Sequence, residues 1–388
     1  MHERSPKTKR VGLMTSKSNV LRCVDVWDSD YDLQRFINDI LTNSYQHTIF
    51  FSGHEWEWEI NINRLGITIE ELNERLKEQG KTLDVLSAGE HYTRTPTYSN
   101  IQVHTYHGWW LIKAATGQYT NIDVHRYNIN PFDINKELLN RTSTFQYSFC
   151  SLNNRSHPHR CLMMDMLAKH ELIDKGAISW RNHEDGRPLY YEWKHFAPRV
   201  MLLSDIPSND PYEFPNYYLP PKECDQSFVQ LVSESTYKTI FVTEKTINPI
   251  LCYRPFIVAA APNFYKVLDQ LGYVRYDELF DYSFDDVLDH DLRTEMIAQN
   301  IKRVTEMTPN QQLDMFNQLK PKLIHNFNVT MNYVLNENNW HPLLREAINY
   351  YNTTKINTCT NAINPYITMT MMRDAVNKSS HLYHNRFD

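Results

Sequence analysis

The chain has 388 residues, of which 41 % are hydrophobic and 22 % are charged, and its formal net charge is −6. This balance supports one or two folded domains and excludes a wholly disordered or fibrous chain. The negative charge argues against a large nonspecific nucleic-acid surface, although it leaves room for a local basic groove.

The cysteines give no sign of a metal or redox centre. All six are scattered, and no two of them have C-x-x-C spacing. We expect Cys161 and Cys252, which lie in apolar stretches, to be small buried hydrophobic residues. No apolar run is long enough to span a membrane. We therefore expect a cytoplasmic protein in a reducing environment, without membrane contact.

Apolar runs and amphipathic stretches alternate over residues 1–140, which predicts a parallel α/β domain there. The predicted elements, in chain order, are a strand at 10–15, a helix at 31–43, a strand at 47–53, a helix at 68–80 and a strand at 82–89. Thr68 and Glu71 can form a capping box at the start of the second helix, and Gly80 can end it.

The same alternation predicts a second α/β domain over 141–330, followed by a helical tail over 331–388 that can pack back on the first domain. We expect an acidic loop at 276–286, and residues 181–222 give no clear assignment. The other predicted elements are a strand, a polar loop and a helix within 144–174, strands at 176–180, 226–235 and 254–261, and helices at 243–253, 263–272, 291–307 and 309–334.

Two successive modules of this kind predict two Rossmann-like domains that face each other across a cleft. In open α/β sheets, ligands bind beyond the carboxyl ends of the strands, where loops lead into helix N-termini. Two loops of the second module are candidates for such a site.

The first candidate loop lies within residues 150–164, between a predicted strand and a predicted helix. It contains Asn153, Arg155 and Arg160. Arginines near the positive end of a helix dipole suit a phosphate or diphosphate. A solvated basic loop is the alternative interpretation.

The second candidate loop lies within residues 231–250. Glu234 follows a predicted strand, and Thr243, Glu244 and Lys245 open a predicted helix. A carboxylate at this place can accept hydrogen bonds from both ribose hydroxyls, and a lysine can neutralise a phosphate. The alternative is a helix-capping glutamate beside a surface lysine.

In combination, these loops resemble a known family. Residues 233–264 (SESTYKTIFVTEKTINPILCYRPFIVAAAPNF) resemble the donor-binding signature of the α-1,3-fucosyltransferases. The LNNR…HR loop, the TEK…PFI block and the acidic FDYSFDDVLDHDLR segment resemble even more the glycosyltransferase-like proteins of tailed phages and large DNA viruses. The resemblance covers 145–330. It departs from the fucosyltransferases at Ser235, where they have asparagine, and at the CYRP segment, where they have glycine.

The resemblance implies a glycosyltransferase of the two-domain type called GT-B, which moves a sugar from a nucleotide sugar to a hydroxyl acceptor. It implies that Glu244 holds the ribose, Lys245 the diphosphate, and Glu234 the sugar or its phosphate. The arginines would stabilise the leaving diphosphate. The full set of implied donor-binding residues is Asn153, Arg155, Arg160, Glu234, Thr243, Glu244 and Lys245.

A GT-B enzyme needs no metal, because cationic side chains take its place at the diphosphate. Two Asp-x-Asp sequences, at 28–30 and 289–291, are similar to the motif of metal-using transferases. Neither follows a predicted buried strand, so we interpret both as solvated acids or helix caps. We therefore expect no metal and no other cofactor.

An inverting enzyme would need a general base on the first domain. His54 and Glu55 follow a predicted strand, and Glu90 follows another. Trp56 and Trp58 could form a stacking floor for a sugar or a base, but their alternation with glutamates also fits a half-exposed strand. Further histidines in aromatic surroundings are His91, His104 and His107. A retaining enzyme would not need such a base.

The acceptor stays open at this stage. It can be a glycan or a small molecule, or a hydroxymethylated base of viral DNA, and in that case the protein would work in the host cytoplasm. A noncatalytic α/β binding or virion-interaction protein is a third hypothesis.

Overall fold

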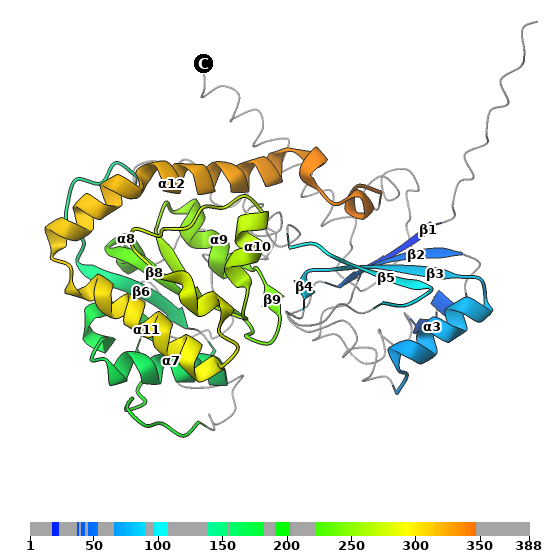
Figure 1. Cartoon of the computed structure of the whole chain (residues 1–388), viewed down its shortest axis with the longest axis horizontal. Helices are drawn as coiled ribbons and strands as arrows, with labels where there is room; N and C mark the ends of the chain where they lie inside the picture. Colours follow the sequence, from blue (N-terminus) through cyan, green and yellow to red (C-terminus); the bar gives the residue numbers. More distant parts are fainter. Residues whose placement is uncertain are drawn as a thin grey trace, which may run out of the picture.

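The computed structural model describes residues 18–22, 37–38, 40–42, 46–52, 66–90, 97–107, 139–153, 155–181, 191–201, 203 and 222–346. These residues form an α/β structure with two parallel four-stranded sheets and one short antiparallel pair (Figure 1). The predicted α/β class is confirmed. The cleft between two domains and the boundaries after residues 140 and 330 stay predictions.

The N-terminal sheet has the strand order β1-β2-β3-β5, and all its pairs are parallel. Its elements are β1 (Ser18–Arg22), β2 (His47–Ser52), α3 (Ile69–Glu78), β3 (Thr82–Ser87) and β5 (Ile101–Thr105). The structure confirms the strands predicted at 47–53 and 82–89 and the helix between them. The sequence does not predict β1, because only Val20 and Leu21 in it are apolar. The strand predicted at 10–15 lies outside the described residues.

One face of this sheet packs against helices. Leu72 of α3 is fully buried in the same cluster as Val85 of β3. The helix predicted at 31–43 has helical backbone at its described positions and contributes Ile37 and Ile40 to this core.

The predicted start and stop of α3 are present. Thr68 Oγ1 accepts a hydrogen bond from the Glu71 N–H at 3.2 Å, and the Glu71 carboxylate accepts one from the Thr68 N–H at 2.9 Å. Gly80 follows the helix with a φ of +64°, a left-handed conformation that glycine adopts without steric cost. The capping box pairs N–H groups that the first helical turn cannot satisfy.

The C-terminal sheet has the strand order β10-β8-β6-β7, and its pairs are also parallel. Its strands are β6 (Tyr147–Asn153), β7 (Gly176–Trp180), β8 (Ser227–Ser233) and β10 (Phe256–Ala259). Its helices are α7 (Pro158–Lys169), α8 (Lys222–Asp225), α9 (Glu244–Leu251), α10 (Phe264–Gln270), α11 (His290–Glu306) and α12 (Pro309–Leu335). Short 3-10 turns are η1 (Ile173–Lys175), η2 (Tyr282–Asp286) and η3 (Glu337–Asn339). The strands and helices predicted for this part are confirmed.

Helices cover both faces of the C-terminal sheet (Figure 1). α7 and α11 pack together on one face, and α9 and α12 pack together on the other. For α7 the sequence predicts a single apolar face, formed by Leu162, Met163, Met166 and Leu167. In the structure Leu162, Met163 and Leu167 are buried, Met166 is half-buried, and Met164 outside the predicted face is buried as well.

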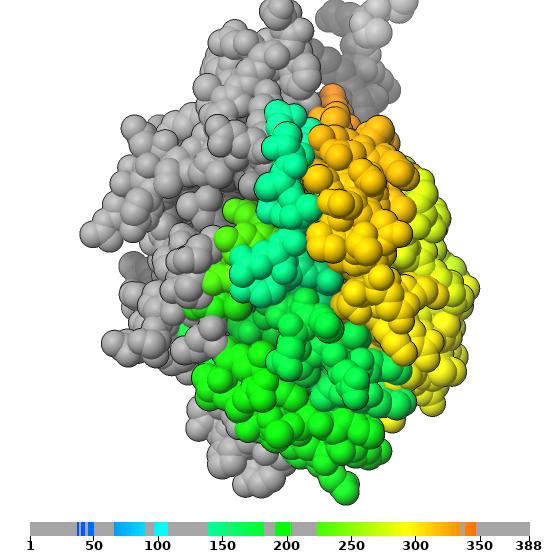
Figure 2. All heavy atoms as spheres, turned by 90° about the vertical axis from the view of Figure 1, so that its left-hand side faces the viewer, coloured from blue at the N-terminus to red at the C-terminus, as the bar shows by residue number. Residues whose placement is uncertain are grey.

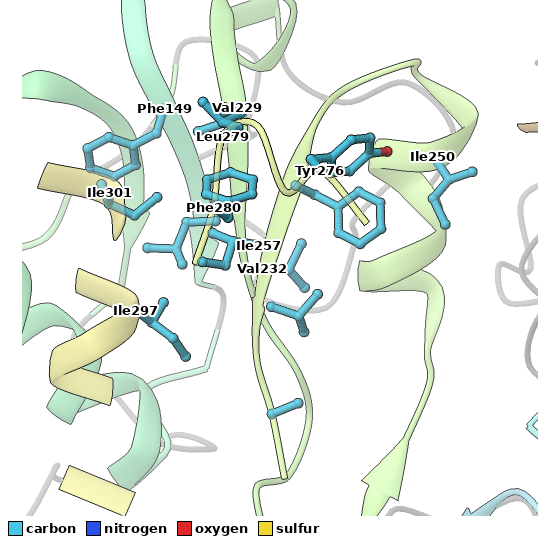
Figure 3. Close-up of a cluster of buried hydrophobic side chains, with 14 of the residues drawn as sticks. Phe149, Val229, Val232, Ile250, Ile257, Tyr276, Leu279, Phe280, Ile297 and Ile301 are labelled. Atoms are coloured by element: carbon cyan, nitrogen blue, oxygen red, sulfur yellow. The ribbon is translucent and has the colours of Figure 1, made fainter. Parts of the chain in front are cut away.

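The main hydrophobic core lies between the C-terminal sheet and these helices (Figure 3). Phe149 of β6 and Ile297 and Ile301 of α11 are buried in it. A Cβ atom at Gly176 would lie 2.4 Å from the Phe149 ring. Glycine at this position therefore allows the ring to lie over the start of β7.

The stretch at 276–286 consists of turns and the 3-10 helix η2, and its acids other than Asp285 are exposed, as expected for an acidic loop. The sequence does not predict that its aromatic residues are buried. The side chains of Tyr276, Tyr282 and Phe284 are buried in the core. The Asp285 carboxylate accepts hydrogen bonds from main-chain N–H groups at the start of α10. Because exposed acids alternate with buried aromatic residues, the acidic composition of this stretch does not indicate that part of it belongs to the core.

The long helix α12 runs beside the segment that leads into β6 (Figure 2). The Phe316 ring lies 5.5 Å from the Phe145 ring, and Gln312 Nε2 donates to Ser148 Oγ at 2.9 Å. The helix continues to residue 335, so the tail predicted from residue 331 begins inside it.

Two sets of contacts connect the sheets. β4 (Gly89–Glu90), just after β3, pairs antiparallel with β9 (Ile240–Phe241), just before α9. After α12, the His341 ring lies 5.2 Å from the His104 ring and 5.8 Å from the Tyr106 ring of the N-terminal part. The segment after α12 thus contacts the N-terminal sheet.

None of the helices in the described part of the chain is long and apolar enough to cross a lipid bilayer. The described cysteines Cys150, Cys161, Cys224 and Cys252 are buried free thiols, as the sequence predicts for two of them.

The buried Asp165 of α7 gives a stability prediction. Its carboxylate accepts hydrogen bonds from the N–H groups of Lys194, His195 and Phe196, at distances from 2.7 to 3.2 Å. Asp165→Ala would leave these N–H groups without an acceptor. We expect the free energy of unfolding in urea to fall by about 3 kcal/mol. The control is Asp174→Ala, at an exposed acid, and an equal loss there would contradict the prediction.

Candidate functional site

The strand order places a topological switch point in the C-terminal sheet. From β6 the chain moves to β7 on one side and then to β8 on the other side. The loops after β6 and β8 therefore diverge, and open α/β sheets bind ligands in the crevice that this divergence leaves. Both candidate loops predicted from the sequence lie at this point, because they follow β6 and β8.

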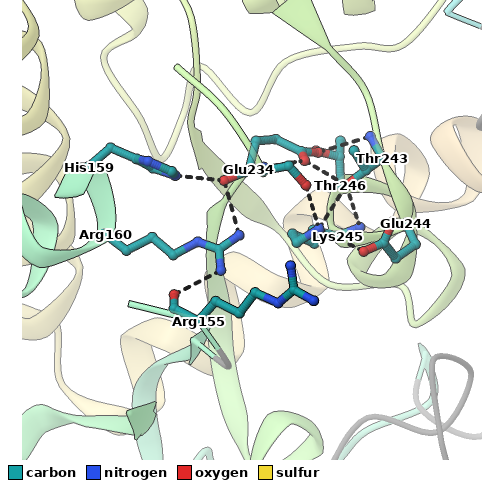
Figure 4. Close-up of polar contacts among 9 residues, drawn as sticks. Arg155, His159, Arg160, Glu234, Thr243, Glu244, Lys245 and Thr246 are labelled. Atoms are coloured by element: carbon teal, nitrogen blue, oxygen red, sulfur yellow. Dashed lines mark hydrogen bonds and ion pairs between the residues drawn. The ribbon is translucent and has the colours of Figure 1, made fainter. Parts of the chain in front are cut away.

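Glu234, the first residue after β8, is fully buried and its carboxylate is surrounded by donors (Figure 4). The hydroxyls of Thr243 and Thr246 donate to it at 2.6 Å each. The N–H groups of Thr243 and Ser235 donate to it at 3.1 and 3.2 Å. The resemblance implies that Glu234 holds the sugar of the nucleotide sugar or its phosphate. In the structure its carboxylate receives these four hydrogen bonds from the protein itself.

The main chain of Glu234 joins the two loops. Its carbonyl accepts hydrogen bonds from His159 Nε2 at 2.9 Å and from Arg160 Nη2 at 3.3 Å. Arg160 Nη1 also donates to the Arg155 carbonyl at 3.0 Å. These hydrogen bonds join the loop after β6 to the loop after β8, and the buried Arg160 guanidinium is part of this connection.

Thr243, Glu244 and Lys245 open the helix α9, as the sequence predicts. Thr243 caps the helix by accepting from the Lys245 N–H at 3.2 Å. Lys245 Nζ donates to Glu244 Oε1 at 2.7 Å and to Ser235 Oγ at 2.8 Å. The Lys245 side chain is 30 % exposed and that of Glu244 is 8 % exposed. Figure 4 shows the Arg155 side chain on the same side of the loops as this pair.

Several buried polar atoms at this edge have no hydrogen-bond partner among the described residues. They are Asn153 Oδ1, Ser156 Oγ and Ser233 Oγ. The register of β6 and β8 places Asn153 beside Ser233. Buried polar atoms are usually paired, so such a group indicates a place for ordered water or for polar atoms of a ligand.

An aromatic stack that the sequence does not predict borders the site. The Tyr237 ring lies 4.2 Å from the His290 ring at an angle of 6°, and 5.4 Å from the His159 ring. Burial lowers the pKa of His159 well below its usual range, and burial also lowers the pKa of His290 to about 4. Only the position of His290 at the start of a helix could have pointed to it in the sequence.

The Glu234 carboxyl is subject to opposing influences. Burial raises its pKa, and the positive charge of Lys245 and the two threonine hydroxyls act in the opposite direction. Burial is the largest of these influences, so the pKa of Glu234 lies above its usual value. The four hydrogen bonds that reach the carboxyl oxygens come from N–H and O–H donors.

The predicted bases are described only in part. His54 and Glu55 lie outside the described residues, and so does the Asp-x-Asp sequence at 28–30. The backbone of Glu90 pairs with Ile240 in the β4–β9 ladder. Asp289 caps α11, as the sequence predicts. In the described part of the chain, no three His, Cys, Asp or Glu residues are grouped so that they could hold a metal ion.

Comparisons with known proteins give distant structural likeness. No protein-family model and no curated protein matches the chain. A crystal structure of an α1,3-fucosyltransferase is 13 % identical, with a TM-score of 0.34, over 81 % of this chain and 91 % of that one. A structure of α1,3-fucosyltransferase with GDP-fucose has the same identity and TM-score, over 85 % and 93 % of the two chains. A likeness of this size does not identify a family.

The buried His159 and the half-buried His290 predict a pH dependence of stability. Their pKa values in the folded protein lie below the value of about 6.5 in an unfolded chain. The unfolded chain therefore binds more protons below about pH 6.5, and the free energy of unfolding falls as the pH falls from there towards 4. Each histidine contributes up to about 1.4 kcal/mol per pH unit.

The measurement is urea unfolding across this pH range. His290→Phe keeps an aromatic ring against Tyr237 and removes the titrating group. We expect this variant to have a shallower dependence on pH than the parent protein, and identical slopes would contradict the assignment of His290.

Proposed function

We propose that the protein is a glycosyltransferase that moves a sugar from a nucleotide-sugar donor to a hydroxyl acceptor. The observation that supports it is the meeting of Arg155, Glu244 and Lys245 at the switch point between β6 and β8. A diphosphate needs cations, a ribose needs a hydrogen-bond acceptor, and this edge of the sheet offers both. The resemblance of residues 145–330 to glycosyltransferases supports the reaction type.

In this proposal Lys245 and Arg155 bind the diphosphate, and Glu244 accepts from the ribose hydroxyls. The Lys245 ammonium donates to Glu244 and Ser235, and the diphosphate would replace part of that coordination. The cations would stabilise the negative charge that grows on the diphosphate as the glycosidic bond breaks. They would serve in place of a metal ion. Asn153 has an unpartnered acceptor atom for the same ligand among the described residues.

Arg160, Thr243 and Glu234 have supporting roles in this proposal. Their side-chain hydrogen bonds connect the two loops or cap α9. Among the three predicted bases, we favour Glu90 for an inverting reaction. Its backbone pairs with that of Ile240, which lies shortly before Glu244 in the chain.

The acceptor follows from the class of reaction only as a hydroxyl compound. We favour a glycan or a small molecule. No described feature favours a viral DNA base, a viral origin or a virion partner over these. We place the reaction in the cytoplasm, which fits the buried free thiols of the described cysteines.

A thermal-shift screen with UDP, GDP, CMP and their sugars tests the donor site. A ligand that binds only the folded state raises the melting temperature by mass action, by a few degrees at concentrations far above its dissociation constant. Lys245→Ala should weaken nucleotide binding, so that the shift disappears at the same ligand concentration while the dissociation constant can still be measured at higher concentrations. The matched control is Lys266→Ala, an exposed lysine paired with Asp286, which should keep the shift.

The same screen with EDTA tests the proposed metal independence, and the shift should persist. Transfer assays with glycan, small-molecule and hydroxymethylated-DNA acceptors then separate the candidate reactions, and a DNA acceptor would also give binding that weakens strongly with salt. Absence of any nucleotide shift in folded protein would refute the donor site.

A further inference from the structure

The Glu234 side chain is buried between residues of the candidate site and is enclosed by protein groups (Figure 4). It has no exposed surface, and its carboxylate receives four hydrogen bonds from the protein. A carboxyl group is stable inside a protein only when hydrogen-bond partners replace the lost water. The four donors therefore account for its presence there, with no ligand contact.

The hydroxyl of Thr243 forms hydrogen bonds with both Glu234 and Lys245 and so connects them. A hydroxyl has one hydrogen to donate, and that of Thr243 goes to Glu234 at 2.6 Å. Its oxygen must then act as an acceptor on the other side, where it receives the Lys245 N–H at 3.2 Å and Lys245 Nζ at 3.5 Å. The Lys245 N–H and ammonium can only donate, so the bond from the Thr243 hydroxyl to Glu234 turns its hydrogen away and leaves its oxygen lone pairs facing the lysine.

Ser235 provides a second connection of the same kind. Its N–H donates to Glu234 at 3.2 Å, and its hydroxyl oxygen accepts from Lys245 Nζ at 2.8 Å. Both hydroxyl oxygens that hold the ammonium thus belong to residues fixed by Glu234. On its other side, the Glu234 carbonyl holds Arg160, which binds the carbonyl of Arg155.

We propose that Glu234 is a positioning residue, which orients Lys245 through Thr243 and Ser235 and fixes the distance between this lysine and the Arg155 loop. This inference rests on the proposed function, in which Lys245 binds the diphosphate. It differs from direct contact of Glu234 with the sugar and from a role in stability alone.

A double-mutant cycle on nucleotide affinity tests the connection. Glu234→Gln replaces one acceptor oxygen by an NH₂ group that faces donors, so we expect the dissociation constant of the nucleotide found in the screen to rise at least tenfold. In a Lys245→Ala background the same change should have less than a twofold effect, because the residue through which it acts is gone. Equal effects in both backgrounds would overturn the proposal.

Variants of Thr243 test the same path with a smaller perturbation. Thr243→Ser keeps the hydroxyl and should keep nucleotide affinity, whereas Thr243→Val has a similar shape and should lose as much affinity as Glu234→Gln. If Glu234→Gln fails to fold, this pair carries the test. Equal affinities of the serine and valine variants would overturn the proposal.

A measurement without nucleotide separates this inference from the proposed function. Reductive methylation by formaldehyde and cyanoborohydride, followed by peptide mass spectrometry, reports how firmly each lysine amine is held. We expect Lys245 to react severalfold faster in Thr243→Val than in Thr243→Ser, with Lys266 unchanged in both. Faster reaction without any nucleotide binding would retain the positioning role and refute the donor site. An unchanged rate would refute the positioning role.

Discussion

The structure of the site depends on the burial of one carboxyl group at the end of β8. Glu234 has no contact with solvent, so the chain must supply its donors from the residues around it. This requirement explains why a threonine stands on each side of the Glu244-Lys245 pair, since both threonine hydroxyls point to Glu234. The Glu244-Lys245 pair in the first turn of α9 is therefore part of a hydrogen-bond network that includes the buried Glu234.

The periodicity of the sequence was sufficient for the parallel α/β class, for the strands β2, β3, β7, β8 and β10 and for the cap of α3. It was insufficient where composition and burial disagree. The stretch at 276–286 reads as acidic, yet its aromatic residues belong to the core. β1 has too few apolar residues to give a pattern.

For the site, the sequence located the two loops, because turns after strands carry polar residues in a recognisable order. It could not tell which of these side chains point inward. Spacing alone does not distinguish Glu234, which is fully buried, from Lys245, which is partly exposed. The stack of Tyr237 and His290 was equally inaccessible, because it joins residues from two distant loops.

The β4–β9 pair connects the N-terminal sheet to the segment that leads into α9. It joins the residues just after β3 to the residues just before Thr243 by main-chain pairing at Gly89 and Glu90. A swing of the N-terminal sheet that leaves this ladder intact must carry the first turn of α9 with it. In the proposed enzyme, the tilt of that helix would therefore follow a movement of the N-terminal sheet.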